Sequence, residues 1–202
     1  MQEARSTTVA SPAPRRLRSP TALLAAILPP KAGGIGNDLD GTMTIINSTL
    51  SGNSATNHGG GIHNAGNSGY VNTILKIGDT ILNAASSGEN IYNDDTYWPA
   101  TVSSLGYNLS SDDGGGYLTA TGDQINTDPR LGPLQNNGGP TYTHLPASNS
   151  PAIDAGDPML AMDQRGLGFV RVKNGRIDIG AVEAQGTPAP TPTPTAKPHG
   201  HH

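Results

Sequence analysis

Cysteine is absent from the 202-residue chain, and aromatic residues make up only 4% of it, with one tryptophan and one phenylalanine. The lack of cysteine excludes a disulfide framework and a thiolate metal site. The hydrophobic fraction of 34% is low for a helical bundle, which needs a large apolar core. The composition therefore argues against a bundle of long amphipathic helices.

Basic charge is also scarce, and the formal net charge is −4. Between Arg18 and Arg130 the only lysines or arginines are Lys31 and Lys76. A chain with this balance attracts neither nucleic acid nor an anionic membrane, so neither is expected as a partner.

Long hydrophobic runs are missing as well. The longest apolar-leaning stretch covers residues 21–28 and follows Arg15, Arg16 and Arg18. Eight such residues are too few to cross a bilayer, so no transmembrane span is expected. A basic region before a short apolar one indicates either a signal peptide or a leader in front of a fragment, and residues 1–32 are interpreted as a disordered leader or signal segment.

Glycine (27 residues) and proline (17) are abundant, together with Asn, Ser and Thr, which favours many short strands joined by turns. A repeat is visible among them. Gly33–Asn37 recurs as Gly60–Asn64 and more loosely as Gly88–Asn93, so that Ile-x-Asn anchors are spaced by 27 and then 29 residues. A unit of this length holds two or three short strands and has too little apolar surface to fold alone.

An alternating apolar stretch follows each anchor, over residues 43–50, 74–81 and, in a weaker copy, 102–109. Alternation of Ile, Leu or Val with Thr, Asn or Ser is typical of a half-buried strand. Alignment of the first two copies pairs Ile46 with Ile77, Thr49 with Thr80, and Leu50 with Ile81. We expect the apolar pairs to stack inward on adjacent coils, about 4.8 Å apart.

These features predict an all-β protein with a right-handed parallel β-helix, a short solenoid of about three coils, over residues 33–111. The right hand follows from the crossover rule for parallel strands. Asn at the corners tolerates left-handed backbone geometry and can bond to its counterpart on the next coil. Residues 112–185 carry turn motifs without a period and are expected to form an irregular cap on the last coil. The Pro/Thr-rich residues 186–202 are expected to be a disordered linker and tail.

Two parts of the sequence resemble known bacterial families. Residues 45–54 followed by Gly59–Asn64 resemble β-helix surface proteins related to polymorphic outer-membrane proteins and pectate-lyase-like folds. Residues 105–183 resemble the choice-of-anchor Q domain, on five motifs that occur in this order: Asp128-Pro-Arg-Leu-Gly-Pro133, Asn137-Gly-Gly-Pro-Thr141, Ser150-Pro-Ala-Ile-Asp-Ala-Gly156, Asp163-Gln-Arg-Gly166 and Asp178-Ile-Gly-Ala-Val-Glu183. The resemblance implies a secreted or cell-surface protein, and it supplies fold and location more than chemistry.

The acidic residues raise the question of catalysis. Hydrolases of the β-helix fold use paired carboxylates, and Asp94-Asp95 and Asp112-Asp113 are available. Neighbouring side chains on a strand face opposite ways, and both pairs lie in turn-like contexts. No catalytic residue is therefore assigned.

The sequence also gives only weak signals for metal and cofactor sites. Four loop carboxylates offer hard oxygen ligands for Ca²⁺: Asp112, Asp113, Asp123 and Asp128. They lack the D-x-D-x-D-G spacing, so turn acids are the favoured interpretation and Ca²⁺ remains the alternative. No other cofactor is expected. His58, His63 and His144 have no metal-ligand spacing and are interpreted as turn or ladder residues.

Arg165 is taken as the one arginine in a region rich in carboxylates. A planar guanidinium is satisfied best when it is partly buried against a carboxylate. We expect it beside Asp154, Asp178 or Glu183, and we predict a structural network in the cap that consists of Asp154, Asp163, Arg165, Asp178 and Glu183.

The function expected from these features is that of a non-catalytic secreted or cell-surface module: a scaffold, an adhesin or a glycan-contacting spacer. Its partner would be a surface polysaccharide or a host or cell-envelope component, and the chain would act as a monomer or as the remainder of a longer β-helix. The alternative is a fragment of a polysaccharide lyase or glycoside hydrolase whose catalytic coils are missing. Three carboxylates gathered on the outward face of neighbouring coils would favour the enzyme, and a face of only Asn, Ser and Thr would not.

Overall fold

A computed structural model describes residues 23–25, 33–38, 41–66, 72–84, 87–157, 163–173 and 175–185. The described residues form an all-β structure with one short 3-10 turn, η1 (Gly114–Gly116). Its strands are β1 (Leu23–Ala25), β2 (Ile35–Asn37), β3 (Thr42–Ile46), β4 (Thr49–Ser51), β5 (Ile62–Ala65), β6 (Thr73–Gly78), β7 (Ile81–Asn83), β8 (Ile91–Asp94), β9 (Ala100–Gly106), β10 (Leu109–Ser110), β11 (Leu131–Gln135) and β12 (Thr143–Pro146).

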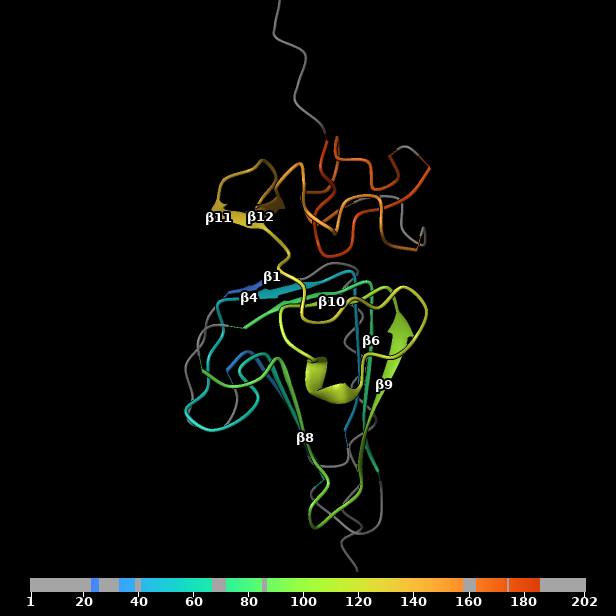
Figure 1. The fold of residues 1–202 in the computed structure, drawn as a ribbon. Helices are drawn as coiled ribbons and strands as arrows, with labels where there is room; N and C mark the ends of the chain where they lie inside the picture. The colour runs from blue at the N-terminus through green and yellow to red at the C-terminus, as the bar shows by residue number, and fades with distance from the viewer. Residues whose placement is uncertain are drawn as a thin grey trace, which may run out of the picture.

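The first ten strands form three parallel sheets, in the orders β2-β5-β8, β3-β6-β9 and β1-β4-β7-β10. Each coil contributes one strand to each sheet, so the chain turns around a central lumen about three times. Figure 1 looks along this stack, and the three sheets appear as the sides of a triangle. The prediction of a short parallel β-helix is confirmed.

The Ile-x-Asn anchors align as the sequence predicts. Ile35, Ile62 and Ile91 follow one another in register in the β2-β5-β8 sheet, and the three asparagines two residues later do the same. Asn37 Nδ2 donates to Asn64 Oδ1 at 2.7 Å, and Asn64 Nδ2 donates to the Oδ1 of Asn93 at 2.6 Å. The expected bonding of corner asparagines from coil to coil is therefore present.

The glycines before the anchors allow the coils to approach closely. A Cβ atom added to Gly33 would lie 2.0 Å from the carbonyl oxygen of Gly60, and one added to Gly60 would lie 2.6 Å from that of Gly88. Any larger residue at these positions would push the coils apart, because the obstructing atoms belong to the backbone.

The predicted register of the alternating stretches is wrong by one residue. Ile45, and not Ile46, lies opposite Ile77, and Ile46 lies opposite Gly78. Thr49 lies opposite Ile81, and Leu50 lies opposite Leu82. Side chains alternate along a strand, so a shift of one residue exchanges the faces. Leu50 and Leu82 consequently fill the lumen, whereas Ile81 packs in a separate cluster outside it.

The third copy departs from the prediction at a β-bulge. Ile77 pairs with Ser104, but Gly78 pairs with Gly106, so one extra residue, Leu105, is inserted in β9. Leu105 is 54% exposed. The bulge restores the register in which Leu109 lies opposite Ile81.

The lumen of the solenoid holds an apolar cluster, whose buried residues are Ile45, Leu50, Ile62, Leu75, Ile77, Leu82, Ile91 and Leu118. Leu118 comes from the segment after β10, which crosses the last coil. In this segment η1 packs against β8, and Gln124 forms a parallel bridge with Leu109. Residues 111–127 therefore close the end of the coils, and we call them the end cap.

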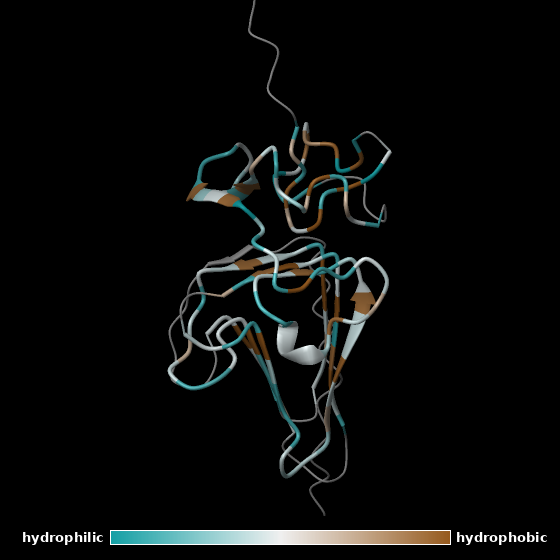
Figure 2. Cartoon of the chain, in the orientation of Figure 1, coloured by the Kyte–Doolittle hydropathy of each residue, from teal (hydrophilic) through white to brown (hydrophobic). Residues whose placement is uncertain are grey.

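The remainder of the expected cap lies elsewhere. Residues 128–157, 163–173 and 175–185, here called the lateral lobe, contain the antiparallel β11–β12 pair and pack on the outward face of the β1-β4-β7-β10 sheet (Figure 1). A second apolar cluster joins the two parts and consists of Ile81, Leu109, Ala152 and Ile179. Figure 2 shows apolar segments both in the strands around the lumen and in the lobe above the sheet. The predicted single cap thus divides into an end cap and a lobe on the side of the stack.

Part of the expected leader is also ordered differently. Leu23–Ala25 form β1, which pairs in parallel with β4, where a disordered leader or signal segment is expected. The rest of the leader and the tail from residue 186 lie outside the described residues. Within the described part of the chain, no helix has the length and apolar character needed to cross a bilayer.

Candidate functional site

The four carboxylates considered for Ca²⁺ hold turns together. Asp112 accepts hydrogen bonds from Asn90 N at 2.7 Å, from Ser110 Oγ at 2.7 Å and from Gly114 N at 2.8 Å. Burial alone would raise the pKa of Asp112, but these hydrogen bonds outweigh it, and its pKa lies below the ordinary value. The Asp112 carboxylate therefore anchors the beginning of the end cap on β8.

The other three acids have similar local partners. Asp123 accepts from Ser104 Oγ at 2.6 Å and from Asn108 N at 2.9 Å, Asp113 accepts from the backbone N–H of Gly115, and Asp128 from that of Arg130. The structure does not bring the four carboxylates together as one group of metal ligands.

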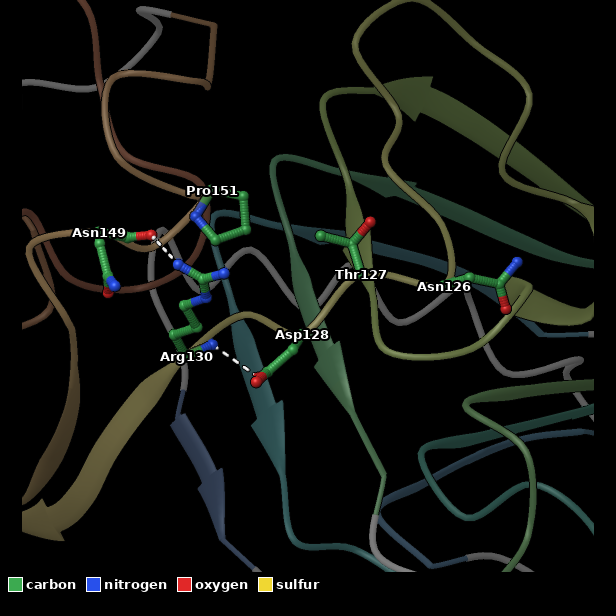
Figure 3. Close-up of a pocket in the computed structure, with 6 residues that line it drawn as sticks. All are labelled: Asn126, Thr127, Asp128, Arg130, Asn149 and Pro151. Atoms are coloured by element: carbon green, nitrogen blue, oxygen red, sulfur yellow. Dashed lines mark hydrogen bonds between the residues drawn. The ribbon is translucent and has the colours of Figure 1, made fainter.

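A hollow of about 460 Å³ opens where the end cap meets the lateral lobe (Figure 3). Its lining consists of Asn126, Thr127, Asp128, Arg130, Asn149 and Pro151. The Arg130 guanidinium crosses it and donates from Nη1 to the carbonyl oxygen of Asn149 at 3.0 Å. Asn126 and Arg130 both have positive φ angles of 50°, which non-glycine residues adopt rarely. We interpret the hollow as the joint between the two parts, because residues of both line it and Gln124 of the end cap donates to the Pro151 carbonyl oxygen at 3.2 Å.

Arg165 is buried, as predicted, but its carboxylate partner differs from the expected ones. Its Nη2 lies 2.5 Å from Asp163 Oδ2, its Nε lies 3.1 Å from the same oxygen, and the Phe169 ring packs 4.1 Å from the guanidinium carbon. Glu183 contributes only its carbonyl oxygen, which accepts from Nη2 at 2.5 Å. Asp163 is the favoured partner because a turn aligns the two side chains, with Asp163 Oδ1 also accepting from Arg165 N at 2.8 Å.

A second arginine, Arg171, shares this region, so the prediction of one arginine among the carboxylates is wrong. It is completely buried. Its Nη2 donates to Asn47 Oδ1 at 2.9 Å, to the Asp178 carbonyl at 3.0 Å and to the Gly180 carbonyl at 2.5 Å. Burial lowers the pKa of the guanidinium, and the charge of Glu183 counteracts this. The only sequence signal for Arg171 is its position between two valines in a strand-like stretch.

Three of the predicted network residues do meet. Asp154, Asp178 and Glu183 place carboxylate oxygens within 4.8 Å of one another, and they are the one such group of potential metal ligands in the described residues. Asp178 Oδ1 accepts from Asp154 N at 2.8 Å, and Glu183 Oε2 accepts from Asp178 N at 2.9 Å. Burial raises the pKa of Glu183 to about 7. With Arg171 as a neighbouring counter-charge, these residues serve first to hold the lobe together.

A different group of side chains faces outward from the β2-β5-β8 sheet. His63 of β5 and Tyr92 of β8 lie side by side in register, with ring centroids 5.4 Å apart. His58 stacks on Tyr92 with a centroid distance of 4.2 Å and an interplanar angle of 11°. Its Nδ1 lies 3.0 Å from Oε1 of Glu89. We call His58, His63, Glu89, Tyr92 and Asp94 the aromatic face.

Acidic side chains surround these rings. Burial lowers the pKa of His63, and the negative charges of Asp94, Asp38 and Glu89 offset this only in part, so the imidazole is neutral at neutral pH. Burial and the charges of Asp94 and Glu89 raise the pKa of the Tyr92 phenol, which keeps its proton. The face therefore combines flat rings with nearby carboxylates, those of Glu89 and Asp94 beside β8 and that of Asp38 after β2.

Two further aromatic residues lie in the loop that follows β8. Tyr97 is 83% exposed and Trp98, the only tryptophan of the chain, is 45% exposed. The backbone of Trp98 passes so close to Gly66 that a Cβ atom there would lie 2.1 Å from the Trp98 carbonyl oxygen. This contact fixes the loop beside the end of β5.

The sequence predicts His63 to be a turn or ladder residue, and it lies on β5 in register with Tyr92. It does not predict the aromatic face, because the residues in register at this position are Gly36, His63 and Tyr92, which share no residue type. Only the register of the coils brings them together.

Comparison of the chain with protein-family models, with curated proteins and with solved structures finds no match.

Proposed function

We propose that the chain is a non-catalytic surface module that contacts glycans through the aromatic face. The observation that carries the proposal is the stacked His58–Tyr92 pair, which stands beside Glu89 and Asp94 on the outside of a parallel sheet. Aromatic rings offer flat apolar surfaces to the C–H faces of sugars, and carboxylates accept hydrogen bonds from sugar hydroxyl groups.

The sheet beneath the rings supports this function. His63 and Tyr92 project from strands whose other faces are locked in the lumen by Ile62 and Ile91, which are 0% and 1% exposed. A rigid backbone limits the conformational entropy that is lost when a ligand binds. An extended glycan could therefore lie across the coils without reordering them.

The motif order from Asp128 to Glu183 supports a finer proposal, that the chain is a choice-of-anchor Q protein displayed by a bacterium at its surface or secreted. Asp163, Arg165, Asp178 and Glu183 come from two of these motifs and meet in one buried network of the lobe. In this proposal the lobe is a structural element, and the chain acts as a monomer or as the end of a longer β-helix.

Glycan-array screening followed by calorimetry tests the function. We expect at least one oligosaccharide to bind, and Tyr92→Ala to weaken its binding roughly tenfold, because a ring contact contributes on the order of 1 kcal/mol. Tyr142→Ala is the matched control, because Tyr142 is 62% exposed and lies in the lobe. Equal binding by the parent and Tyr92→Ala would contradict the proposal.

One observation favours the alternative class, a polysaccharide lyase or glycoside hydrolase, with the candidate groups in this chain rather than in missing coils. His63 lies within the influence of three carboxylates that flank two different strands, those of Asp38, Glu89 and Asp94. A neutral imidazole among carboxylates has the groups needed for acid–base catalysis. Release of reducing ends from neutral and acidic polysaccharides, abolished by Asp94→Asn, would establish this activity and replace the proposal of a non-catalytic module.

A further inference from the structure

The coils carry an acidic charge that is almost uncompensated. Between residues 33 and 127 there are nine acidic residues (Asp38, Asp40, Asp79, Glu89, Asp94, Asp95, Asp112, Asp113 and Asp123) and one basic residue, Lys76, so the formal charge of this segment is −8. Lys76 lies on β6, in a different sheet from the aromatic face. The field around the coils therefore attracts cations and repels polyanions.

The charge is concentrated around the stacked rings. The carboxylates of Asp94, Glu89 and Asp95 act on the Tyr92 phenol, and those of Asp94, Asp38 and Glu89 act on His63. The Glu89 carboxylate already contacts His58, whereas within the described part of the chain the Asp94 carboxylate accepts a hydrogen bond from the backbone N–H of Thr96 at 3.2 Å. Carboxylate acceptors thus remain available beside the ring faces.

Rings combined with carboxylates form the arrangement that recognises ammonium groups. An ammonium ion is attracted to the face of an aromatic ring and hydrogen-bonds to carboxylates with all its donors. Resting on the proposed glycan-contacting function, we propose that the aromatic face binds glycans that contain amino sugars with free, protonated amines. The flat ring surface suits the sugar, and the surrounding acids suit its ammonium group.

The same charges exclude the acidic polysaccharides on which pectate-lyase-like enzymes act. A uronate carboxylate placed beside Glu89 and Asp94 would meet like charge, which disfavours binding. The aromatic face is therefore selective between classes of glycan, and the selectivity can be measured.

The experiment compares three oligosaccharides of equal length on the full chain by calorimetry: fully deacetylated chito-oligosaccharide, its fully acetylated form, and oligogalacturonate. At neutral pH, where the His63 ring is uncharged, we expect the deacetylated form to bind roughly tenfold tighter than the acetylated form, and oligogalacturonate not to bind. Binding of the deacetylated form should weaken as salt is added, because it depends on exposed charges.

Two substitutions separate the contribution of the carboxylate from that of the aromatic ring. Asp94→Asn keeps an oxygen that can accept from the N–H of Thr96 and should remove most of the preference for the amine, while binding of the acetylated form stays the same. Tyr92→Ala should weaken binding of both forms. Asp128→Asn is the matched control, because it removes one exposed acid from the hollow of Figure 3 and none from the aromatic face.

Each outcome has one meaning. Equal or tighter binding of the acetylated form overturns the amino-sugar inference and leaves the glycan-contacting function in place. Absence of binding by all three oligosaccharides overturns the amino-sugar inference, and absence of binding across the glycan array as well overturns the glycan-contacting function. Polylysine that binds as tightly as the amino sugar, with no effect of Tyr92→Ala, also overturns the inference, because it shows attraction by charge alone.

Discussion

Single residues at the corners of the coils determine how closely the chain turns. Asn47, Asp79 and Tyr107 occupy equivalent positions between the second and third strands of successive coils, and their φ angles are 49°, 47° and 55°. Asparagine is expected at such corners because it tolerates the left-handed region, and Asn47 fits this expectation. It does not predict Tyr107, where the stacking of the coil imposes a conformation that tyrosine does not prefer.

Asn64 is the central member of the asparagine ladder and is completely buried. Asn64→Ala removes the acceptor of the buried Asn37 amide and the donor to the half-buried Asn93, and leaves both without these partners. We expect the free energy of unfolding to fall by about 2–4 kcal/mol, measured by urea denaturation. Asn57→Ala, at an exposed bend, is the control and should change it little. A loss at residue 64 no larger than that at residue 57 would show that the ladder does not stabilise the coils.

Arg165 tests whether the lobe depends on the shape of the guanidinium or on charge alone. Lysine keeps the charge, but it lacks the planar fork that contacts Asp163 through two nitrogens and reaches the Glu183 carbonyl. We expect Arg165→Lys to destabilise the lobe by roughly 3 kcal/mol and to lower the melting temperature. Arg176→Lys, at an exposed position, should leave it unchanged. Identical melting of the two variants would remove the structural role of Arg165.

At the scale of strands, the sequence predicts the elements better than their register. The Ile-x-Asn anchors identify β2, β5 and β8 correctly because both the isoleucine and the asparagine must face inward in every coil. The stretch around Ile45 and Ile46 offers two adjacent isoleucines, and either alignment preserves an apolar pair with Ile77. Only the burial of Ile45 and the outward packing of Ile81 against the lobe select one of them.

The corrected register predicts different roles for two neighbouring residues. Leu82→Ala makes a cavity in the lumen, so the coils as a whole should lose about 2–5 kcal/mol of stability. Ile81→Ala removes a contact beneath the lobe and should expose the lobe to proteases while the coils stay protected. Limited proteolysis with mass spectrometry distinguishes the two. Reversed cleavage patterns would favour the register in which Ile81 faces the lumen.

For the whole molecule, the position of the lateral lobe is the feature that the sequence does not predict. The lobe is attached by contacts between residues far apart in the chain, such as Arg171 with Asn47 and Ala181 with Thr49. The sequence repeat cannot predict such contacts, because each of them occurs only once in the chain. The aromatic face is equally invisible, since it arises from unlike residues that stacking brings into register.

The buried acids of the lobe and its junction predict how stability depends on pH. Burial raises the pKa of Glu183 to about 7 and that of Asp79 to about 6, whereas both ionise near pH 4 in an unfolded chain. The folded protein then binds more protons than the unfolded chain between about pH 4 and about pH 7, so the free energy of unfolding falls as the pH rises through this window. For Glu183 the loss is on the order of 3 kcal/mol.

Melting temperatures measured between about pH 4 and about pH 8 test this dependence. The parent should melt at lower temperature as the pH rises, and Glu183→Gln should flatten the profile, because the amide oxygen can still accept from Asp178 N but no longer ionises. A parent whose stability rises over this range would contradict the assignment of a raised pKa to the buried acids.

The lateral lobe hydrogen-bonds to Asn47 and to Thr49 of β4, and these contacts have a mechanical consequence. A force applied between residues 41 and 185 enters the coils at β3 and leaves them through the lobe, which bonds to Asn47, Thr49 and Asp79. The lobe also packs on Ile81 and Leu109, so β5, β8 and β9 lie outside the path of the load. We expect single-molecule pulling to rupture the lobe first, in one event, and only afterwards to peel the coils from β10 backward. The contacts of the lobe then protect the stacked coils from tension along the chain.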